Sequence, residues 1–321
     1  MGDLMKELRK VVLIGTGMVG MSMAYSLMNT GGIDELILID IDKEKAKGEA
    51  MDLNHGLPYS FNKMKIKEGD YRECQDSDIV VICAGCNQKE GQTRLELVQQ
   101  NTKIIKDIAK KIYFSGFHGV VIVASNPVDI LSYVVYKIMK IDNNKVIGTG
   151  TLLDTARMKY MLSEYLNISS DNIEAYILGE HGDSSFISWV NTYVGCKRLL
   201  EYIDEKNLDM NDLNDIYDEV KNAAYEIIER KNATYYGIGV SLNKLINAIF
   251  NDTHEILCVS SYLDGEYGCK DIYMGVPCVI TREGVKEVIE LPLDGFDKNK
   301  LNESYEILRK IKREVRKDLE L

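Results

Sequence analysis

One stretch, residues 11–40, constrains the fold of this chain more than any other. An apolar run at 11–14 is long enough for a strand buried on both faces, and a glycine-rich segment, 15–20, follows it at once. Residues 21–28 contain neither Gly nor Pro, which favours a helix, and a second apolar run ends in Asp40. Strand, glycine turn, helix, strand and terminal acid, in this order, predict the βαβ unit that binds dinucleotides.

The glycines and the acid have separate roles in such a unit. Gly15 permits a tight turn, Gly17 lets the backbone approach a pyrophosphate, and Gly20 lets helix and strand pack closely. The pyrophosphate then lies at the positive end of the helix. Asp40 can accept both ribose hydroxyls and would repel a 2′-phosphate, so we expect NAD rather than NADP. The predicted cofactor-binding residues of this unit are Gly15, Thr16, Gly17, Met18, Val19, Gly20 and Asp40.

The formal charge of −11 argues against a general affinity for nucleic acid or for an anionic membrane. No apolar run approaches the roughly eighteen residues of a membrane span, and residues 1–10 lack the apolar core of a signal peptide. The seven cysteines are odd in number and scattered, which is typical of reduced thiols. We therefore expect a cytoplasmic protein without nucleic-acid or membrane partners.

Cys83 and Cys86 have C-x-x-C spacing, which is found in redox pairs. No second pair exists to complete a zinc site, and Cys83 ends an apolar strand. Small residues at a strand end are the favoured interpretation, and a redox pair is the alternative.

The first half of the chain alternates apolar strands with helical stretches. The predicted elements after the opening unit are a helix at 43–52, a strand at 79–84, an amphipathic helix at 97–112 and strands at 120–124 and 146–148. Alternation of this kind predicts a parallel, doubly wound Rossmann sheet, with ligands at the carboxyl ends of its strands. Ala84 and Gly85 stand at such an end and are assigned to the cofactor site.

The second half has a different pattern, that of an α+β domain with antiparallel strands. Its predicted elements are helices at 152–166, 211–250 (interrupted near 231–237) and 297–318, and strands at 173–178, 187–194, 255–262 and 273–281. The sequence therefore predicts two domains, 1–148 for the dinucleotide and 149–321 for substrate and catalysis.

Four histidines are available as a physiological acid or base. His181 differs from the others, because it follows a predicted buried strand directly and lies between Gly179 and Gly182. Scaffold would hold such a histidine while leaving it accessible, so a catalytic and a structural role both fit this position. No histidine pair has H-x-x-x-H spacing, and we predict no metal site.

Asp154 and Arg157 are three residues apart on a predicted helix and so share a face. Two ordinary interpretations compete with a functional one. Thr151 and Asp154 match a capping box, and Asp154 with Arg157 would make a common surface pair. Arg94 ends a polar stretch that could be a solvated loop.

Several of these motifs together resemble the family of NAD-dependent L-lactate and malate dehydrogenases over essentially the whole chain. The matching stretches occur in the family's order: 15–20, Asp40, 88–94, 125–128, 153–157 and 179–184. The resemblance implies that His181 is the acid/base and Asp154 its orienting partner. It also implies that Arg157 clamps the substrate carboxylate and that Arg94 acts from a mobile loop. Asn126 would bridge cofactor and substrate, and Thr234 would form a wall of the substrate pocket.

In the family that this chain resembles, the position equivalent to Gln88 looks like Gln in lactate enzymes and like Arg in malate enzymes. A cation in the pocket would stabilise the second carboxylate of oxaloacetate, whereas a neutral pocket suits the methyl group of pyruvate. Gln88 therefore favours pyruvate and L-lactate as substrates. A malate enzyme and an enzyme for bulkier 2-hydroxy acids are the alternatives within the family, and a homotetramer is the assembly that the resemblance implies.

The chain departs from the family pattern at positions that concern regulation. Many bacterial enzymes of the family that this chain resembles look to be activated by fructose 1,6-bisphosphate, which an Arg and a His bind. This chain has Lys159 and Glu174 at those two positions. Glu174 would repel a phosphate, so we expect weak or absent activation.

A different class of function is a structural or sensing module that binds NAD without catalysis. The presence of Asp154, His181 and both arginines argues against this hypothesis.

Overall fold

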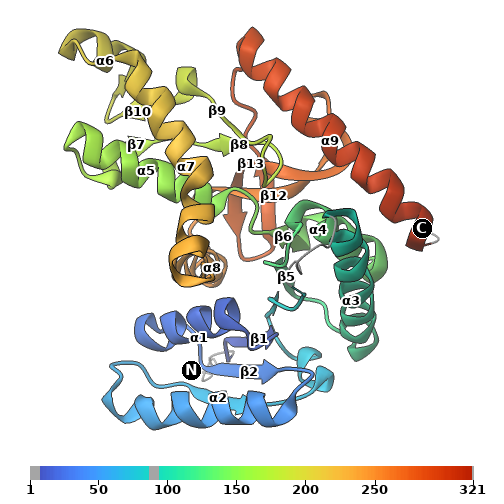
Figure 1. The fold of residues 1–321 in the computed structure, drawn as a ribbon. Coiled ribbons are helices and arrows are strands. Elements are labelled where there is room, and N and C mark those ends of the chain that lie inside the picture. The colour runs from blue at the N-terminus through green and yellow to red at the C-terminus, as the bar shows by residue number, and fades with distance from the viewer. Residues whose placement is uncertain (1–7, 87–93, 320–321) are drawn as a thin grey trace, which may run out of the picture.

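The computed structural model describes residues 8–86 and 94–319 (Figure 1). Nine strands of the described chain share one sheet: β1 (Lys10–Ile14), β2 (Glu35–Ile39), β3 (Lys65–Glu68), β4 (Ile79–Ile82), β5 (Val120–Val123), β6 (Val146–Gly148), β12 (Ile256–Asp264), β13 (Lys270–Thr281) and β14 (Gly284–Val288). Their order is β14-β13-β12-β6-β5-β4-β1-β2-β3. The six strands of the first half are parallel, and the last three are antiparallel to their neighbours. The order β3-β2-β1-β4-β5-β6 is that of a doubly wound dinucleotide fold, which confirms the predicted class.

Helices connect the parallel strands of the first half: α1 (Met18–Thr30), α2 (Lys43–Gly56), α3 (Arg94–Ser115) and α4 (Val128–Met139). The strands carry almost no exposed side chains, because both faces of the sheet are covered; Val11 and Ile82, for example, are wholly buried. α3 and α4 pack against each other beside the centre of the sheet (Figure 1). The carboxyl ends of β1, β4 and β5 therefore meet at one edge, where ligands bind in such folds.

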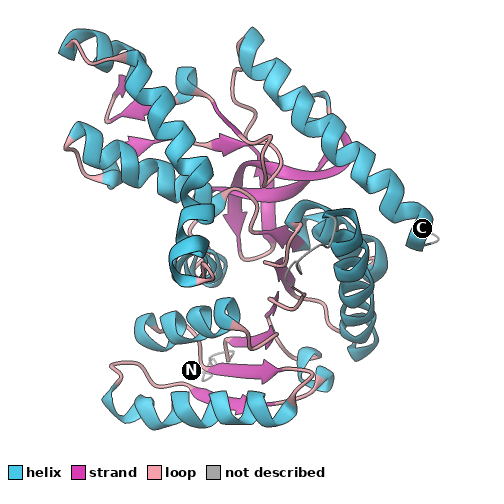
Figure 2. Cartoon of the chain, in the orientation of Figure 1, coloured by secondary structure: helices cyan, strands magenta, loops and turns pink. Residues whose placement is uncertain are grey.

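The second half combines long helices with short strands (Figure 2). Its helices are α5 (Leu152–Leu166), α6 (Leu199–Lys206), α7 (Met210–Lys231), α8 (Tyr236–Phe250) and α9 (Gly295–Leu319). Two small antiparallel sheets contain β7 (Ile173–Glu174), β8 (Ile177–Leu178), β9 (Phe186–Ile187), β10 (Tyr193–Val194) and β11 (Lys197–Arg198). The break between α7 and α8 falls within the predicted interruption at 231–237, which confirms it.

The large sheet continues from the first half into the second, because Gly148 of β6 pairs with Ser260 of β12. One apolar core accordingly includes side chains of both halves, among them Leu13 and Met274. A smaller second core forms around α5 and α7, with Met158 and Leu213 as members. Over the part of the chain that the structure describes, no helix is both long and apolar enough to cross a membrane.

Two strand predictions were wrong in part. The run 173–178 is two strands, β7 and β8, and the run 187–194 is β9, a 3-10 turn at Trp189–Asn191 and β10. Side chains explain the second break, since Thr192 donates its hydroxyl to the Ser188 carbonyl and Asn191 donates to the Ser188 hydroxyl. Such local bonds compete with a strand ladder. The short elements β3, β11, β14 and α6 were not predicted.

Candidate active site

The glycine turn joins β1 to α1 and has the geometry of a dinucleotide cradle. Gly15 has φ +102°, and a Cβ at this position would lie 2.8 Å from the Ala84 backbone nitrogen. A Cβ at Gly20 would lie 2.2 Å from the Gly15 carbonyl oxygen, so helix and strand pack too closely for any side chain. Gly17 caps α1 without a side-chain bond and faces open space. The first-turn N–H groups of α1 are therefore accessible to an anion such as a pyrophosphate.

Asp40 directly follows β2 and bonds to the glycine turn. Its Oδ2 accepts bonds from the Thr16 backbone nitrogen (2.7 Å) and hydroxyl (2.8 Å), and its Oδ1 accepts one from the Asp42 nitrogen (3.0 Å). Partial burial opposes the charge, but these bonds outweigh it and hold the pKa of Asp40 below its ordinary value. The ionised Oδ1 keeps lone pairs for ribose hydroxyls, and the residues present thus fit NAD.

The ends of β4 and β5 are tied together next to the glycine turn. Ser125 donates its hydroxyl to the Ala84 carbonyl at 2.5 Å. The buried side chain of Asn101, on α3, accepts a bond from the Cys86 nitrogen (2.8 Å) and donates one to the Asn126 carbonyl (2.9 Å). Asn126 is thereby held at the edge where the predicted cofactor-binding residues Ala84 and Gly85 also lie.

His181 joins Asp154 and Arg157, although no spacing in the sequence brought it to that pair. Asp154 Oδ1 accepts a bond from Arg157 Nη1 at 3.0 Å, and Asp154 Oδ2 lies 2.8 Å from His181 Nδ1. The side chains of Asp154 and Arg157 are each 14% exposed. The surface-pair alternative is therefore wrong: this carboxylate is shared between a guanidinium and an imidazole.

The capping-box alternative is wrong as well. Thr151 is the N-cap residue of α5 but makes no side-chain cap. Its hydroxyl instead donates to the Ile177 carbonyl at 2.5 Å, and the Thr155 hydroxyl accepts a bond from the Ile177 nitrogen at 3.1 Å. These two bonds fasten α5 to β8. They place Asp154 opposite the turn that carries His181.

The charges in this group favour a protonated histidine. Burial alone would lower the pKa of His181, but the Asp154 carboxylate raises it above its ordinary value despite the opposing charge of Arg157. Burial would likewise raise the pKa of Asp154, but His181 and Arg157 hold it below its ordinary value. Asp154 thus stays ionised, and His181 Nε2 is left to exchange a proton with a ligand.

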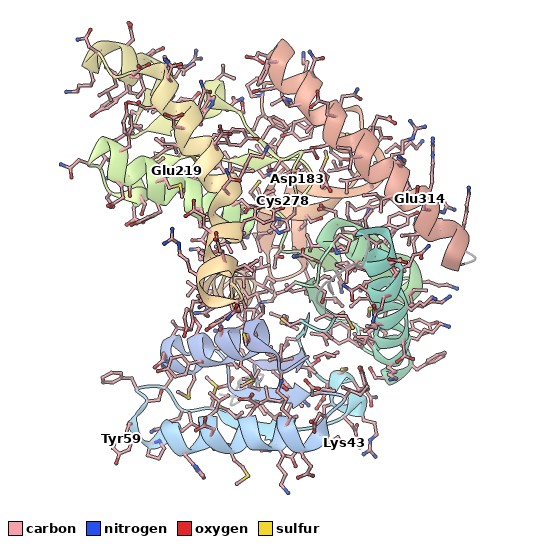
Figure 3. The ribbon with its side chains drawn as sticks, in the orientation of Figure 1. Lys43, Tyr59, Asp183, Glu219, Cys278 and Glu314 are labelled. Carbon is pink, nitrogen blue, oxygen red and sulfur yellow. The ribbon has the colours of Figure 1, made fainter. Side chains whose placement is uncertain are left out.

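A cavity of about 340 Å³ opens beside these residues. Asn126, Asp154, Arg157 and His181 line its polar side. Val220, Ala224 and Ile228 of α7 line an apolar side, and Lys221, Asp183 and Ser185 complete much of the rest. In Figure 3 Asp183 lies near the centre of the molecule. Glu219 lies on α7, and Lys43 lies on α2, at the end of the molecule away from Asp183. A small anion with an apolar group suits such a cavity.

Other predicted residues lie outside this group or outside the described chain. Gln88 falls outside the described residues, and of Arg94 only the backbone, at the start of α3, is described. Thr234 lies between α7 and α8 and is absent from the described lining of the cavity. Lys159 is half-buried on α5, and Glu174 is exposed on β7.

Cys83 and Cys86 do not support a redox pair. Both are free, and burial raises the pKa of the Cys83 thiol to about 12. A redox pair needs an accessible thiolate, which such a thiol does not supply. The favoured interpretation as small strand-end residues fits the structure.

Sequence reasoning missed a buried carboxylate that contacts His181. Asp129, in the first turn of α4, is 2% exposed and accepts a bond from the His181 backbone nitrogen at 2.9 Å. The available signal was its position as a lone acid at the start of the apolar run 128–135. Nothing in the sequence indicated the partner of its carboxylate.

A doubly wound sheet with a glycine cradle, and an Asp–His–Arg group beside it, define a nicotinamide-dependent dehydrogenase. Comparison with known families agrees. The model for the lactate/malate dehydrogenase NAD binding domain matches residues 9–148, and the model for the lactate/malate dehydrogenase alpha/beta C-terminal domain matches residues 151–318. The chain belongs to the lactate/malate dehydrogenase family, and the matched first domain confirms NAD as its cofactor.

Individual relatives are similar over nearly their full length. L-lactate dehydrogenase 2 of Bacillus cereus is 48% identical over 305 residues, which cover 95% of this chain and 97% of that protein. L-lactate dehydrogenase of Priestia megaterium is 48% identical over 302 residues, 94% of this chain and 95% of that one. Among solved structures, the ligand-bound minor L-lactate dehydrogenase of Enterococcus mundtii has a TM-score of 0.95 at 46% identity, covering 97% of this chain and 99% of that chain.

Proposed function

We propose that this protein interconverts pyruvate and L-lactate with NADH and NAD. One observation carries the proposal: Asp154 holds a guanidinium and an imidazole, at 3.0 and 2.8 Å, on the wall of one small cavity. A 2-oxo acid presents a carboxylate and a carbonyl oxygen on adjacent carbons, and these two cations match them. The two curated relatives described above are both named L-lactate dehydrogenase, which supports the same activity.

The residues of the cavity divide the work of reduction. Arg157 offers a planar guanidinium to the substrate carboxylate, which Lys could not match in geometry. His181 Nε2 gives its proton to the carbonyl oxygen, and Asp154 keeps the ring oriented and the imidazolium stable beforehand. When bound, NADH would provide the hydride that reduces the carbonyl group. In the oxidation of lactate His181 takes the hydroxyl proton back.

Three further residues are assigned by proposal. Asn126 would contact both the cofactor and the substrate, which fits its place on the cavity wall at the end of β5. Arg94 would stabilise the developing negative charge on the carbonyl oxygen, so its contribution should grow toward the transition state. Thr234 would limit the size of the substrate side chain.

We also infer a division into units 1–148 and 149–321, and the two family models, ending at 148 and starting at 151, support it.

Substrate preference is assigned to Gln88. A neutral amide suits the methyl group of pyruvate, and a cation there would suit the second carboxylate of oxaloacetate. Oxidation of NADH with each 2-oxo acid tests this: pyruvate should be preferred by at least about tenfold in kcat/KM, a difference of about 1.4 kcal/mol. Preference for oxaloacetate would make the malate enzyme the correct alternative.

A pair of variants separates position from charge. Gln88→Arg should reverse the preference toward oxaloacetate. Gln92→Arg is the matched control, because it adds the same charge to the same segment of sequence. If both variants shift the preference equally, Gln88 is not the determinant.

Self-association is proposed from the surface as well as from the resemblance. Large apolar side chains are exposed on α1, α5 and α8: Tyr25, Tyr160, Tyr236 and Val240 are each at least 60% exposed. A groove of about 740 Å³ between α1 and α8 adjoins three of them. Exposed apolar side chains that gather at a groove, as Tyr25, Tyr236 and Val240 do, mark protein interfaces. We infer a homotetramer in the cytoplasm, and light scattering at micromolar concentration would show a monomer if this is wrong.

We further propose weak or absent activation by fructose 1,6-bisphosphate. The exposed carboxylate of Glu174 supports this, since it would repel a phosphate group. Pyruvate saturation curves measured with and without millimolar bisphosphate should nearly coincide. A sharp fall in the half-saturation concentration would overturn the proposal.

A further inference from the structure

A buried carboxylate stands behind the backbone of His181. Asp129 is 2% exposed, and its two oxygens have different partners. Oδ2 accepts a bond from the His181 backbone nitrogen at 2.9 Å, and Oδ1 accepts one from the Ser260 hydroxyl at 2.5 Å. Ser260 itself is wholly buried in β12. The carboxylate therefore ties three segments, α4, β12 and the His181 turn, at a single point.

This arrangement is expensive in free energy. No salt bridge to Asp129 forms among the described residues, so two neutral donors are its partners. Burial raises the pKa of Asp129 to about 6, although both hydrogen bonds oppose the shift. An uncompensated buried charge is a poor device for stability alone. Its position suggests a functional reason.

The segments that Asp129 joins are those that carry the proposed chemistry. α4 begins directly after Asn126 and Pro127. On the other side, Gly179 exchanges two backbone bonds of 2.9 Å with Gly275 of β13. The chain that leads into His181 is thus fixed to the large sheet by Gly179 and to α4 by Asp129. The two anchors lie two residues apart.

We propose that Asp129 is a positioning residue for His181: its carboxylate fixes the His181 main chain and its negative charge supports the imidazolium. The inference deepens the proposed function and rests on it, since it takes His181 as the proton donor. Asp154 acts on the ring nitrogen, and Asp129 acts on the backbone nitrogen. The histidine is therefore held between two carboxylates from two different helices.

Several charges act on His181 besides Asp129, and they set the background for any titration. The described charged groups around it are Asp154 and Arg157 on α5, Asp129 on α4, Glu180 and Asp183 in its own turn, and Lys221 on α7. Arg157 lowers the pKa of His181, whereas Asp154 and Asp129 raise it. Removing the Asp129 charge alone should therefore shift the His181 pKa downward.

The test compares two buried aspartates of similar setting. Asp129→Asn keeps the size of the side chain and an acceptor for the His181 nitrogen but removes the charge. Asp297→Asn is the matched control: Asp297 is 3% exposed, lies in the first turn of α9 and accepts a 2.5 Å bond from Ser188. Among the described contacts Asp297 has none with His181.

The readout is the pKa of the His181 ring in the full-length protein, measured by NMR and assigned by the signal that His181→Gln removes. Asp129→Asn should lower it by about half a pH unit or more, and Asp297→Asn should leave it in place. The pH profile of kcat/KM for pyruvate reduction should move by the same amount. An unchanged His181 pKa in folded Asp129→Asn would overturn the inference.

The NMR titration needs no turnover, so a wild-type protein that fails to reduce pyruvate would refute the proposed function while the inference about the pKa is still decided. If Asp129→Asn does not fold, Ser260→Ala replaces it. Loss of the serine donor lowers the ionised fraction of Asp129 at neutral pH. The pKa of His181 should therefore fall, but by less than in Asp129→Asn. No shift in folded Ser260→Ala would overturn the inference.

Discussion

Replacing Asp154 by Asn should damage the proposed reaction in a pH-dependent way. Asp154 makes two charge-assisted contacts, 3.0 Å to Arg157 and 2.8 Å to His181, and is only 14% exposed. Each hydrogen bond to a charged group contributes about 1.5–3 kcal/mol. Because the two contacts share one carboxylate, we expect a joint loss of about 2–4 kcal/mol in transition-state stabilisation. That corresponds to a fall of about 30- to 1000-fold in kcat/KM for pyruvate.

The sign of the pH effect follows from the pKa of His181. Asp154 raises this pKa, so the Asn variant should have a lower one. Pyruvate reduction needs protonated His181 and is therefore lost as the pH rises through this pKa. The loss caused by Asp154→Asn should be largest near pH 8 and smallest near pH 5.5.

The assay is NADH oxidation at saturating NADH, followed by absorbance from about pH 5.5 to pH 8.5. Asp252→Asn is the control, because Asp252 also lies beside a histidine, 3.6 Å from His254, but on the surface. It should change kcat/KM by less than about twofold. A fall of less than threefold in Asp154→Asn, or a fall that is equal at every pH, would refute the reasoning.

Three further predictions follow from single residues. Arg157→Lys should raise the KM for pyruvate by about 10- to 100-fold, because an ammonium cannot pair with Asp154 and fork a carboxylate together; an unchanged KM in steady-state assays would contradict this. Asp40→Ser should lower the NADH-to-NADPH ratio of kcat/KM at least about tenfold, because the repulsion of a 2′-phosphate is removed; an unaltered ratio would argue against that role. Asp129→Asn should gain stability over the wild type between about pH 4 and pH 7. The folded pKa of Asp129, about 6, exceeds its ordinary 3.8, so the wild type loses up to about 3 kcal/mol as the pH rises through this window. Urea unfolding of both proteins at about pH 4 and pH 7 measures the difference in their free energies of unfolding. An equal difference at the two pH values would contradict the prediction.

Much of the fold was predictable because the signals are local. The glycine turn at 15–20, the apolar strands of the first half and helix 152–166 each show their period or their breakers within a few residues. The breaks that divide the predicted runs 173–178 and 187–194 into two-residue strands were beyond this reasoning, and so was β11. The backbone bonds of these strands are shared with turns and side chains, so no alternation builds up.

The candidate site was predictable only in its parts. His181 was singled out by its position after a buried strand, but its contact with Asp154 joins residues 27 apart in the chain. That contact depends on Thr151 and Thr155 fastening α5 to β8, which no spacing rule reveals. Only the family resemblance brought the two together. Asp129 lay beyond both approaches, because its partner is a backbone nitrogen.

Single-turnover oxidation of NADH tests the central claim most directly. Enzyme loaded with one NADH per subunit is mixed with excess pyruvate, for the wild type and for His181→Ala, and NADH affinity is measured in parallel. The wild type should oxidise its NADH in one fast phase. His181→Ala should be slower by about 100-fold or more, as expected for loss of a general acid, with NADH affinity within about threefold. Oxidation by His181→Ala at a rate close to that of the wild type would contradict the assignment of His181 as the proton donor.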